Sequence, residues 1–388
     1  MRRPLALACG ISALVLLGGC NFFKSKSSKD NFDPPTELTE IEASTRFDEI
    51  WSADVSGDKG RSGGALRPAL AAGRAFLAGV DGELEARQLE SGKVLWEVET
   101  GIRGSGGPGT DGRRVVIGGL DGEVAAYDVD GGEQLWTAQL SSEVLAAPLV
   151  TADLVVIRTN DGRTHGLEAG DGKVRWTHDS TVPLLTLRGN ASPVSDGTAV
   201  FVGGDNGKLT ALDLSNGKLR WEQAVNLSDG RNELERLIDM DGQVRTDQGD
   251  LFVGAYNGNA TALVAESGTA LWSLEASTAV GVDLSRSLVV VALADGVVLA
   301  LDRRSGGEIW RQEALKFRHL SAPLVDGQNV VLGDLEGYLH ALNLEDGRLV
   351  GRTRLGKRPL AGPAQLADGV VVAQDRDGNI AAYRLEGG

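Results

Sequence analysis

Short apolar runs separated by polar turn residues recur along most of the chain. The stretch Asp205–Trp221 shows the unit: a turn at Asn206-Gly207, an apolar run over residues 209–214, a second turn at Asn216-Gly217, and a further strand that includes Trp221. Asn-Gly between apolar runs is a strong short-range signal of a β-hairpin. The pattern predicts consecutive antiparallel strands, and helical periodicity is confined to the N-terminal apolar run and one segment, residues 226–244.

Tryptophans mark the period of this unit. Six of them have a Gly four residues earlier and a small residue, Ala or Gly, ten residues earlier, and they follow one another at intervals of 40, 40, 45, 51 and 38 residues. They are Trp96, Trp136, Trp176, Trp221, Trp272 and Trp310. A seventh copy carries Gly351 in the Trp position. A period near 40 with four short strands per unit is typical of β-propeller blades.

The two ends of the chain complement each other. The C-terminal DGNIAAYRLEGG stops where the last strand of a unit would begin, and Trp51 near the N-terminus has no preceding copy of the unit. We therefore predict that residues 46–388 form an all-β, eight-bladed β-propeller of four-stranded antiparallel blades, with the last blade closed by the N-terminal strand. Such closure avoids a bare strand edge.

The residue types at the repeated positions indicate the structural role of each position. Gly at the marked positions supplies the positive φ of hairpin turns. The small residue ten positions before the Trp leaves room for a neighbouring ring. Each Trp, from Trp51 to Trp310, is expected to pack between adjacent blades and to find a hydrogen-bond partner for its N–H; a ligand contact is the less favoured interpretation.

The first 19 residues have the pattern of a signal peptide. Arg2 and Arg3 precede an apolar run that is too short to span a membrane, and Leu17–Cys20 resembles a bacterial lipobox. We expect residues 1–19 to be removed, Cys20 to be lipidated and residues 20–45 to act as a flexible tether. The alternative is an ordinary signal peptide with a chance Cys. Because Asn21 follows Cys20 in place of an Asp, the outer membrane is the expected location, on its periplasmic side.

The net charge narrows the possible partners, and the cysteine content excludes a disulfide within the mature chain. The formal net charge is −15, and it becomes two units more negative without Arg2 and Arg3. This argues against nucleic acid as a partner. The second Cys of the sequence, Cys9, falls within the removed segment, so the mature chain has no intramolecular disulfide.

Candidate chemical motifs fit the repeat better than they fit catalysis. The Gly-rich segment Gly104–Gly109 is followed by a strand pattern, whereas a dinucleotide fingerprint opens a helix. Asp375–Gly378 lacks the later ligands of a calcium loop and is interpreted as a blade turn. The four His, which are His165, His178, His319 and His340, are expected to fall in different blades and share no spacing. We expect no enzyme activity, no cofactor and no metal site.

Two neighbouring connections break the period. The intervals that end at Trp221 and Trp272 are the longest, and the extra residues lie between the last strand of one blade and the first strand of the next. The first contains Val182–Gly189, which combines large apolar residues with an Arg, as interface centres do. The second is Asn226–Val244, where Asn232 is expected to cap a short amphipathic helix. Either the two loops form a partner site, or they only pack on each other, with Arg188 paired to Asp239 or Asp241.

The repeat Ala-x-Asp-x-x-Ser/Thr-Gly-x-x-x-Trp resembles that of pyrroloquinoline-quinone-type propellers. Together with the lipobox and the two inserts, the chain resembles the BamB family, the propeller lipoproteins of the outer-membrane β-barrel assembly machinery. The segments that carry this resemblance are Leu185–Gly189, Gly203–Gly207, Glu235–Leu237, Tyr256–Asn259 and Gly337–His340.

This resemblance implies a non-enzymatic scaffold that binds the periplasmic POTRA domains of the central barrel subunit, BamA, and assists the folding and insertion of outer-membrane proteins. By position, the implied contact residues are Leu185, Leu187, Arg188, Asp239 and Asp241. Whether a strand of the partner or of a nascent outer-membrane protein also adds to a blade edge stays open. The alternatives are another periplasmic propeller that binds proteins or glycans and, least favoured, a quinoprotein dehydrogenase.

Overall fold

The computed structural model of the chain describes residues 33–57, 65–183, 191–225, 240 and 242–387. The chain divides into two compact units, Met1–Pro34 and Pro35–Gly388. Almost all of the first unit lies outside the described residues. No helix in the described part of the chain is long and apolar enough to cross a membrane.

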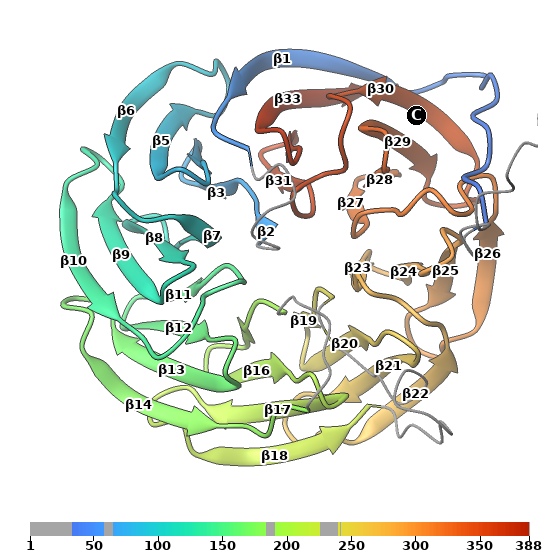
Figure 1. The fold of residues 1–388 in the computed structure, drawn as a ribbon. Helices are drawn as coiled ribbons and strands as arrows, with labels where there is room; N and C mark the ends of the chain where they lie inside the picture. The colour runs from blue at the N-terminus through green and yellow to red at the C-terminus, as the bar shows by residue number, and fades with distance from the viewer. Residues whose placement is uncertain (1–32, 58–64, 184–190, 226–239, 241, 388) are drawn as a thin grey trace, which may run out of the picture. The chain divides into compact units, whose positions relative to one another are not determined.

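The second unit consists of eight sheets arranged around a central axis (Figure 1). In the first four blades, the strands from innermost to outermost are β3 (Ala69–Ala71), β4 (Arg74–Ala78), β5 (Glu83–Gln88), β6 (Val94–Glu99); β7 (Gly104–Thr110), β8 (Arg114–Gly119), β9 (Glu123–Asp128), β10 (Gln134–Gln139); β11 (Leu149–Val150), β12 (Leu154–Arg158), β13 (Arg163–Glu168), β14 (Val174–Asp179); β15 (Val194–Ser195), β16 (Ala199–Gly203), β17 (Lys208–Asp213), β18 (Leu219–Ala224).

The other four blades repeat this order. Their strands are β19 (Arg245–Asp247), β20 (Asp250–Gly254), β21 (Asn259–Val264), β22 (Ala270–Glu275); β23 (Val282–Leu284), β24 (Leu288–Ala292), β25 (Val298–Asp302), β26 (Glu308–Gln312); β27 (Leu324–Asp326), β28 (Asn329–Gly333), β29 (Tyr338–Asn343), β30 (Leu349–Arg354); β31 (Gln365–Ala367), β32 (Val370–Gln374), β33 (Asn379–Glu386), β1 (Arg46–Asp54). The eight-bladed, all-β prediction is confirmed.

Closure of the ring by the N-terminal strand is also confirmed. β1 is the outermost strand of the eighth blade and pairs antiparallel with β33, from Arg46 opposite Glu386 to Asp54 opposite Asn379. One strand was not predicted: β2 (Ala65–Leu66) adds to the innermost strand β7 in parallel, opposite Gly106 and Gly107. A two-residue strand has too few positions to show an alternating pattern.

Antiparallel order gives the ring two distinct faces. Each connection from the outermost strand of one blade to the innermost strand of the next lies on the same face as the turn between the second and third strands, because successive strands reverse direction. We call this the connection face. The remaining turns lie on the opposite face.

The seven tryptophans occupy equivalent places at blade junctions. Each lies on an outermost strand, and its indole N–H donates to a backbone carbonyl of the following blade at 2.7–3.1 Å. The donor–acceptor pairs are Trp51–Leu89, Trp96–Val129, Trp136–Ala169, Trp176–Leu214, Trp221–Ala265, Trp272–Arg303 and Trp310–Leu344. Seven of the eight junctions therefore share one hydrogen bond.

The marked glycines do more than permit a turn. Gly172 has φ of 71°, and a Cβ built there would lie 2.5 Å from Cε3 of Trp136, the tryptophan of the preceding blade. The same contact recurs from Gly92, beneath Trp51, to Gly347, beneath Trp310. In the six repeats from Trp96 to Trp310, the small residue ten positions before the Trp lies opposite it on the neighbouring strand, and Gly166 makes room there for the ring of Trp176.

Candidate functional site

The two long connections lie on the connection face, between β14 and β15 and between β18 and β19. The partner residues expected from the sequence all fall outside the described residues: Leu185, Leu187 and Arg188 in 184–190, and Asp239 and Asp241 beside the described Met240. The expected helix capped by Asn232 and the lipidation site Cys20 fall outside them as well. The structure describes the residues that flank these segments, which we call the stems. They are residues 180–183 and 191–193 in the first connection, and 225, 240 and 242–244 in the second.

The stems of the two connections meet at one residue, Gly203. A Cβ built on Gly203, at the end of β16, would lie 2.9 Å from the carbonyl oxygen of Met240 and 3.4 Å from Cβ of Ala191. Ala191 and Met240 are each about 1 % exposed. Both connections are therefore anchored in the interior at the same point, and only a residue without a side chain fits between them.

The first stem packs against blade 3 and is hydrogen-bonded to it. Ser180 donates its N–H to the carbonyl of Gly162 at 3.0 Å, and a Cβ on Gly162 would collide with Val182. Under this stem, Arg158 at the end of β12 forms an ion pair with Asp205 in the turn after β16, and both side chains are about 95 % buried. The pair ties blade 3 to blade 4 where the connection crosses between them.

Arg158 also faces a small internal space. Its Nη1 is buried and makes no hydrogen bond with the residues that the structure describes. The space it borders, also lined by Thr164, His178 and Gly203, has a volume of about 10 Å³. That is close to the room needed for one water molecule, and a water there would accept a hydrogen bond from Nη1.

The second stem is held by blades 5 and 6. Met240 packs in the same apolar cluster as Val244 and Val225. Gln243 pairs in parallel with Gly281, and its N–H donates to the carbonyl of Val280 at 3.0 Å. This pairing fixes the direction in which the chain leaves the propeller before β19.

Two arginines that sequence reasoning missed lie beside the stems. Arg67, just after β2, donates to Oγ of Ser192 in the first stem at 3.3 Å. Arg245, at the start of β19, pairs with Asp283 at 2.8 Å. Burial and the nearby Arg245 lower the pKa of Arg67 to about 10, so the guanidinium stays charged at neutral pH. Both residues sit outside the repeated phrase, so no sequence signal marked them.

The structure places the other candidate motifs within the blades. The Gly-rich segment Gly104–Gly109 belongs to the innermost strand β7, and Asp375–Gly378 is the turn between β32 and β33, where Oδ1 of Asp375 accepts from the N–H of Asp377 and of Asn379. The prediction that the four His lie in different blades is wrong, because His165 and His178 lie on the paired strands β13 and β14 of blade 3. The described residues contain no group of three or more His, Cys, Asp or Glu side chains placed to hold a metal ion.

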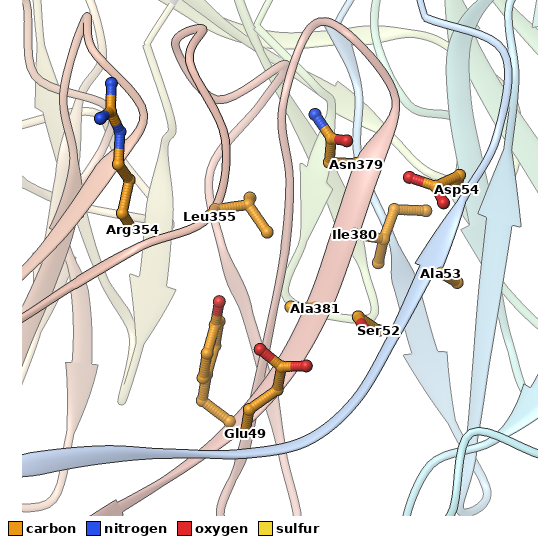
Figure 2. A pocket seen from close by; sticks show the side chains of 10 residues that line it. Glu49, Ser52, Ala53, Asp54, Arg354, Leu355, Asn379, Ile380 and Ala381 are labelled. Carbon is orange, nitrogen blue, oxygen red and sulfur yellow. The ribbon is translucent and has the colours of Figure 1, made fainter.

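A polar cavity of about 270 Å³ opens beside the closing strand (Figure 2). Glu49 and Asp54 of β1 lie along one side, Arg354 at the end of β30 lies on the other, and Ile380 of β33 lies between them. Tyr383 of β33 also lines the cavity. It is at the junction of blades 7 and 8, on the side of the ring away from both long connections. The cavity and the predicted partner segments therefore belong to different parts of the propeller.

Comparison with known proteins agrees with this architecture. The sequence model of the family described as outer membrane protein assembly factor BamB matches residues 80–312 and 294–388. The protein of that name from Pseudomonas aeruginosa is 50 % identical over 331 residues, which cover 85 % of this chain and 87 % of the relative.

A second relative of the same name, from Xanthomonas campestris pv. campestris, is 38 % identical over 404 residues and covers 99 % of this chain and 100 % of its own. The crystal structure of BamB from Moraxella catarrhalis superposes with a TM-score of 0.80 at 28 % identity, covering 87 % of this chain and 99 % of that one. The chain belongs to the BamB family of outer membrane protein assembly factors.

Proposed function

We propose that this protein is a non-enzymatic scaffold of the outer-membrane β-barrel assembly complex, and that its two long connections bind the periplasmic POTRA domains of BamA. The observation that carries the proposal is the convergence of both stems on Gly203. Two segments that start from one buried point can together form one continuous surface for a partner.

The composition of the tips fits such a surface. The first contributes Leu185, Leu187 and Arg188, and the second contributes Asp239 and Asp241. A few apolar residues with an Arg at the centre of an interface commonly supply most of the binding energy. The buried anchors Ala191 and Met240 reduce the ordering cost of the stems on binding, which favours affinity.

The same proposal covers the N-terminal segment and the location. Residues 1–19 are assigned to a signal peptide, Cys20 to lipid attachment, and the residues between Cys20 and the propeller to a tether at the periplasmic face of the outer membrane. The support is the Leu17–Cys20 pattern and membership of a family whose relatives are named outer membrane protein assembly factors.

The proposal is tested with the variant Leu187→Ala/Arg188→Ala and purified POTRA domains of the cognate BamA. A matched control is Leu219→Ala/Arg220→Ala, which removes the same two residue types from the exposed outer strand β18. We expect the first variant to fold like the wild type by circular dichroism and to bind at least about 30-fold more weakly, the effect of losing a central anchor.

The control should bind like the wild type. Undiminished binding by the Leu187/Arg188 variant would exclude this site, and loss of binding by the control alone would move the interface to the outer edge of the ring. A wild-type protein that does not bind the POTRA domains at all would refute the scaffold proposal itself.

A further inference from the structure

The chain ahead of β1 is held against blade 7 by main-chain hydrogen bonds near both ends of residues 36–45. Thr36 donates its N–H to the carbonyl of Lys316 at 3.1 Å, and Ser44 and Thr45 both donate to the carbonyl of Val350 at 2.9 Å. Lys316 belongs to the connection between β26 and β27, whereas Val350 lies at the beginning of β30. Residues 36–45, which we call the strap, therefore run from the connection face to the opposite face, where β30 begins.

Two arginines bind the strap through its main chain. Arg318 donates from Nη1 to the carbonyl of Thr36 at 2.8 Å, and Arg352 donates from Nη1 to the carbonyl of Thr39 at 3.0 Å. Because the acceptors are backbone carbonyls, the arginines recognise the position of the strap rather than its side chains. Carbonyls three residues apart fix both its direction and its register.

One buried carboxylate orients both arginines. Oδ2 of Asp334, which is fully buried, accepts from Nε of Arg318 at 2.7 Å and faces Nε2 of His340 at 2.9 Å. Nδ1 of His340 in turn accepts from Nε of Arg352 at 3.3 Å. A neutral His340 with its proton on Nε2 satisfies all these contacts at once.

The backbone around Arg318 is bent to direct it inward. Phe317 and His319, on either side of Arg318, have φ of 60° and 46°. Residues with a Cβ rarely adopt this left-handed region, and such conformations persist only where the surroundings impose them. The arrangement places the guanidinium in the interior between Asp334 and the strap, with its side chain only about 3 % exposed.

The strap also takes the place of the missing tryptophan. Gly351 stands in the Trp position of blade 7, and a Cβ there would lie 2.6 Å from the carbonyl oxygen of Thr45. Leu38 packs against the buried cluster that contains Trp310 and Leu315. The Thr45 end of the strap therefore lies at Gly351, where the tryptophan is missing, whereas Leu38 lies at the preceding junction, between blades 6 and 7.

We propose that the strap is a latch that fixes where the N-terminal segment leaves the propeller. With the latch closed, the chain departs at Pro35 on the connection face; with it open, the departure point moves to Arg46 on the opposite face. The segment between Cys20 and Pro35 spans at most about 50 Å when fully extended. The latch therefore fixes the point on the propeller from which that segment leaves, and this holds whatever partner the connections bind.

The first test is limited proteolysis of the mature chain with a glutamate-specific endopeptidase. The strap contains Glu37, Glu40 and Glu42, all exposed, so cleavage there reports how often the strap lifts off. Arg352→Ala removes one arginine contact and should speed cleavage in the strap at least about tenfold, the effect of losing one charge-assisted hydrogen bond.

Arg354→Ala is the matched control. Arg354 lies two residues further along β30 and donates to the carbonyls of Gly356 and Glu336, not to the strap. It should be cleaved at the wild-type rate. Cleavage of a folded Arg352→Ala protein at the wild-type rate would overturn the latch. If that variant fails to fold, Arg352→Lys, which keeps the charge but loses the forked donors, takes its place with the same expectation.

The second test measures the departure point. Spin labels at Glu37→Cys and Lys357→Cys, in a Cys20→Ser background, place one label on the strap and one on the connection between β30 and β31. The latch predicts a narrow distance distribution that broadens with Arg352→Ala. A distribution already broad without that substitution would refute a fixed point of departure.

Discussion

At the scale of single residues, the repeat joins each Trp to a Gly of the following blade. The sequence showed both positions and predicted the positive φ of the Gly. It could not show that Gly172 lies against Trp136, because the two residues are 36 positions apart and nothing in the spacing says which ring rests on which turn. Positive φ alone was a sufficient explanation for the Gly until the packing was visible.

Gly172→Ala separates these two roles, with Gly101→Ala as control. Both glycines have φ of 71°, but a Cβ at Gly101 meets nothing within 4 Å. We expect Gly101→Ala to cost about 1 kcal/mol for the left-handed backbone. Gly172→Ala should cost a further 1–3 kcal/mol, roughly the price of overpacking against a ring that is itself buried and hydrogen-bonded.

Urea denaturation of the two variants measures the difference. Equal destabilisation would mean that Trp136 moves aside freely and that the Gly serves only the turn. The expected inequality would explain why the same residue type recurs at seven turns, from Gly92 to Gly347.

At the scale of elements, the sequence predicted the strands that belong to the repeat, but it did not predict the strap, which lies outside the repeat. The closing strand β1 was predictable because Trp51 lacked a unit and the C-terminus lacked a strand. The strap was interpreted as part of a flexible tether, because its fastenings are main-chain carbonyls and amides that leave no mark on composition. The residues expected to bind a partner lie outside the described part of the chain, so their assignment stays a proposal.

The elements of blade 7 are joined by ionisable groups, which makes the blade sensitive to acid. Burial lowers the pKa of His340, as do the neighbouring charges of Arg352 and Arg318, while Asp334 opposes this shift. The unfolded chain therefore binds the proton first as the pH falls. The stabilisation by neutral His340 is complete above about pH 6.5 and declines below it.

Burial would raise the pKa of Asp334, but hydrogen bonds from His340 and Arg318 outweigh it and lower that pKa below 3.8. Its contribution is therefore lost only in stronger acid, so of these two groups only His340 titrates between about pH 6.5 and 4. His165 contributes in the same range, because burial lowers its pKa too.

His340→Gln should reduce this sensitivity. A Gln amide can donate to Asp334 and accept from Arg352 but does not titrate. The melting temperature of the variant should fall less than that of the wild type between pH 7.5 and pH 5. His178→Gln, on the outer strand β14, is the control and should follow the wild type. An unchanged pH response of the His340 variant would show that the network of blade 7 does not limit stability in acid.

At the scale of the whole propeller, the ring is closed by a single antiparallel pair, β1 with β33, whose partners come from opposite ends of the chain. Every other blade is made from one continuous segment, apart from the added strand β2. Formation of this strand pair therefore closes the longest loop in the molecule. Opening it exposes two strand edges and releases the chain entropy of the entire ring.

A disulfide across this pair tests whether unfolding begins there. Arg46 and Glu386 are opposite each other, both exposed and already ion-paired at 3.1 Å. Directly opposed residues have Cα atoms within the range that a disulfide bridges. In a Cys20→Ser background, Arg46→Cys/Glu386→Cys should gain up to about 5 kcal/mol when oxidised, because the closed loop is very long.

The rate of unfolding shows whether unfolding begins at this strand pair more directly than the gain in the free energy of unfolding does. If the closing pair of β1 and β33 separates first, the oxidised protein must unfold by a slower route. Reduction of the disulfide should then restore the original rate. If another junction opens first, the oxidised and reduced forms should unfold at the same rate, because the closing pair is still intact in the transition state. Stopped-flow unfolding in denaturant distinguishes the two cases. Slower unfolding would make the N-terminal strand, and the strap that precedes it, the element on which the lifetime of the ring depends.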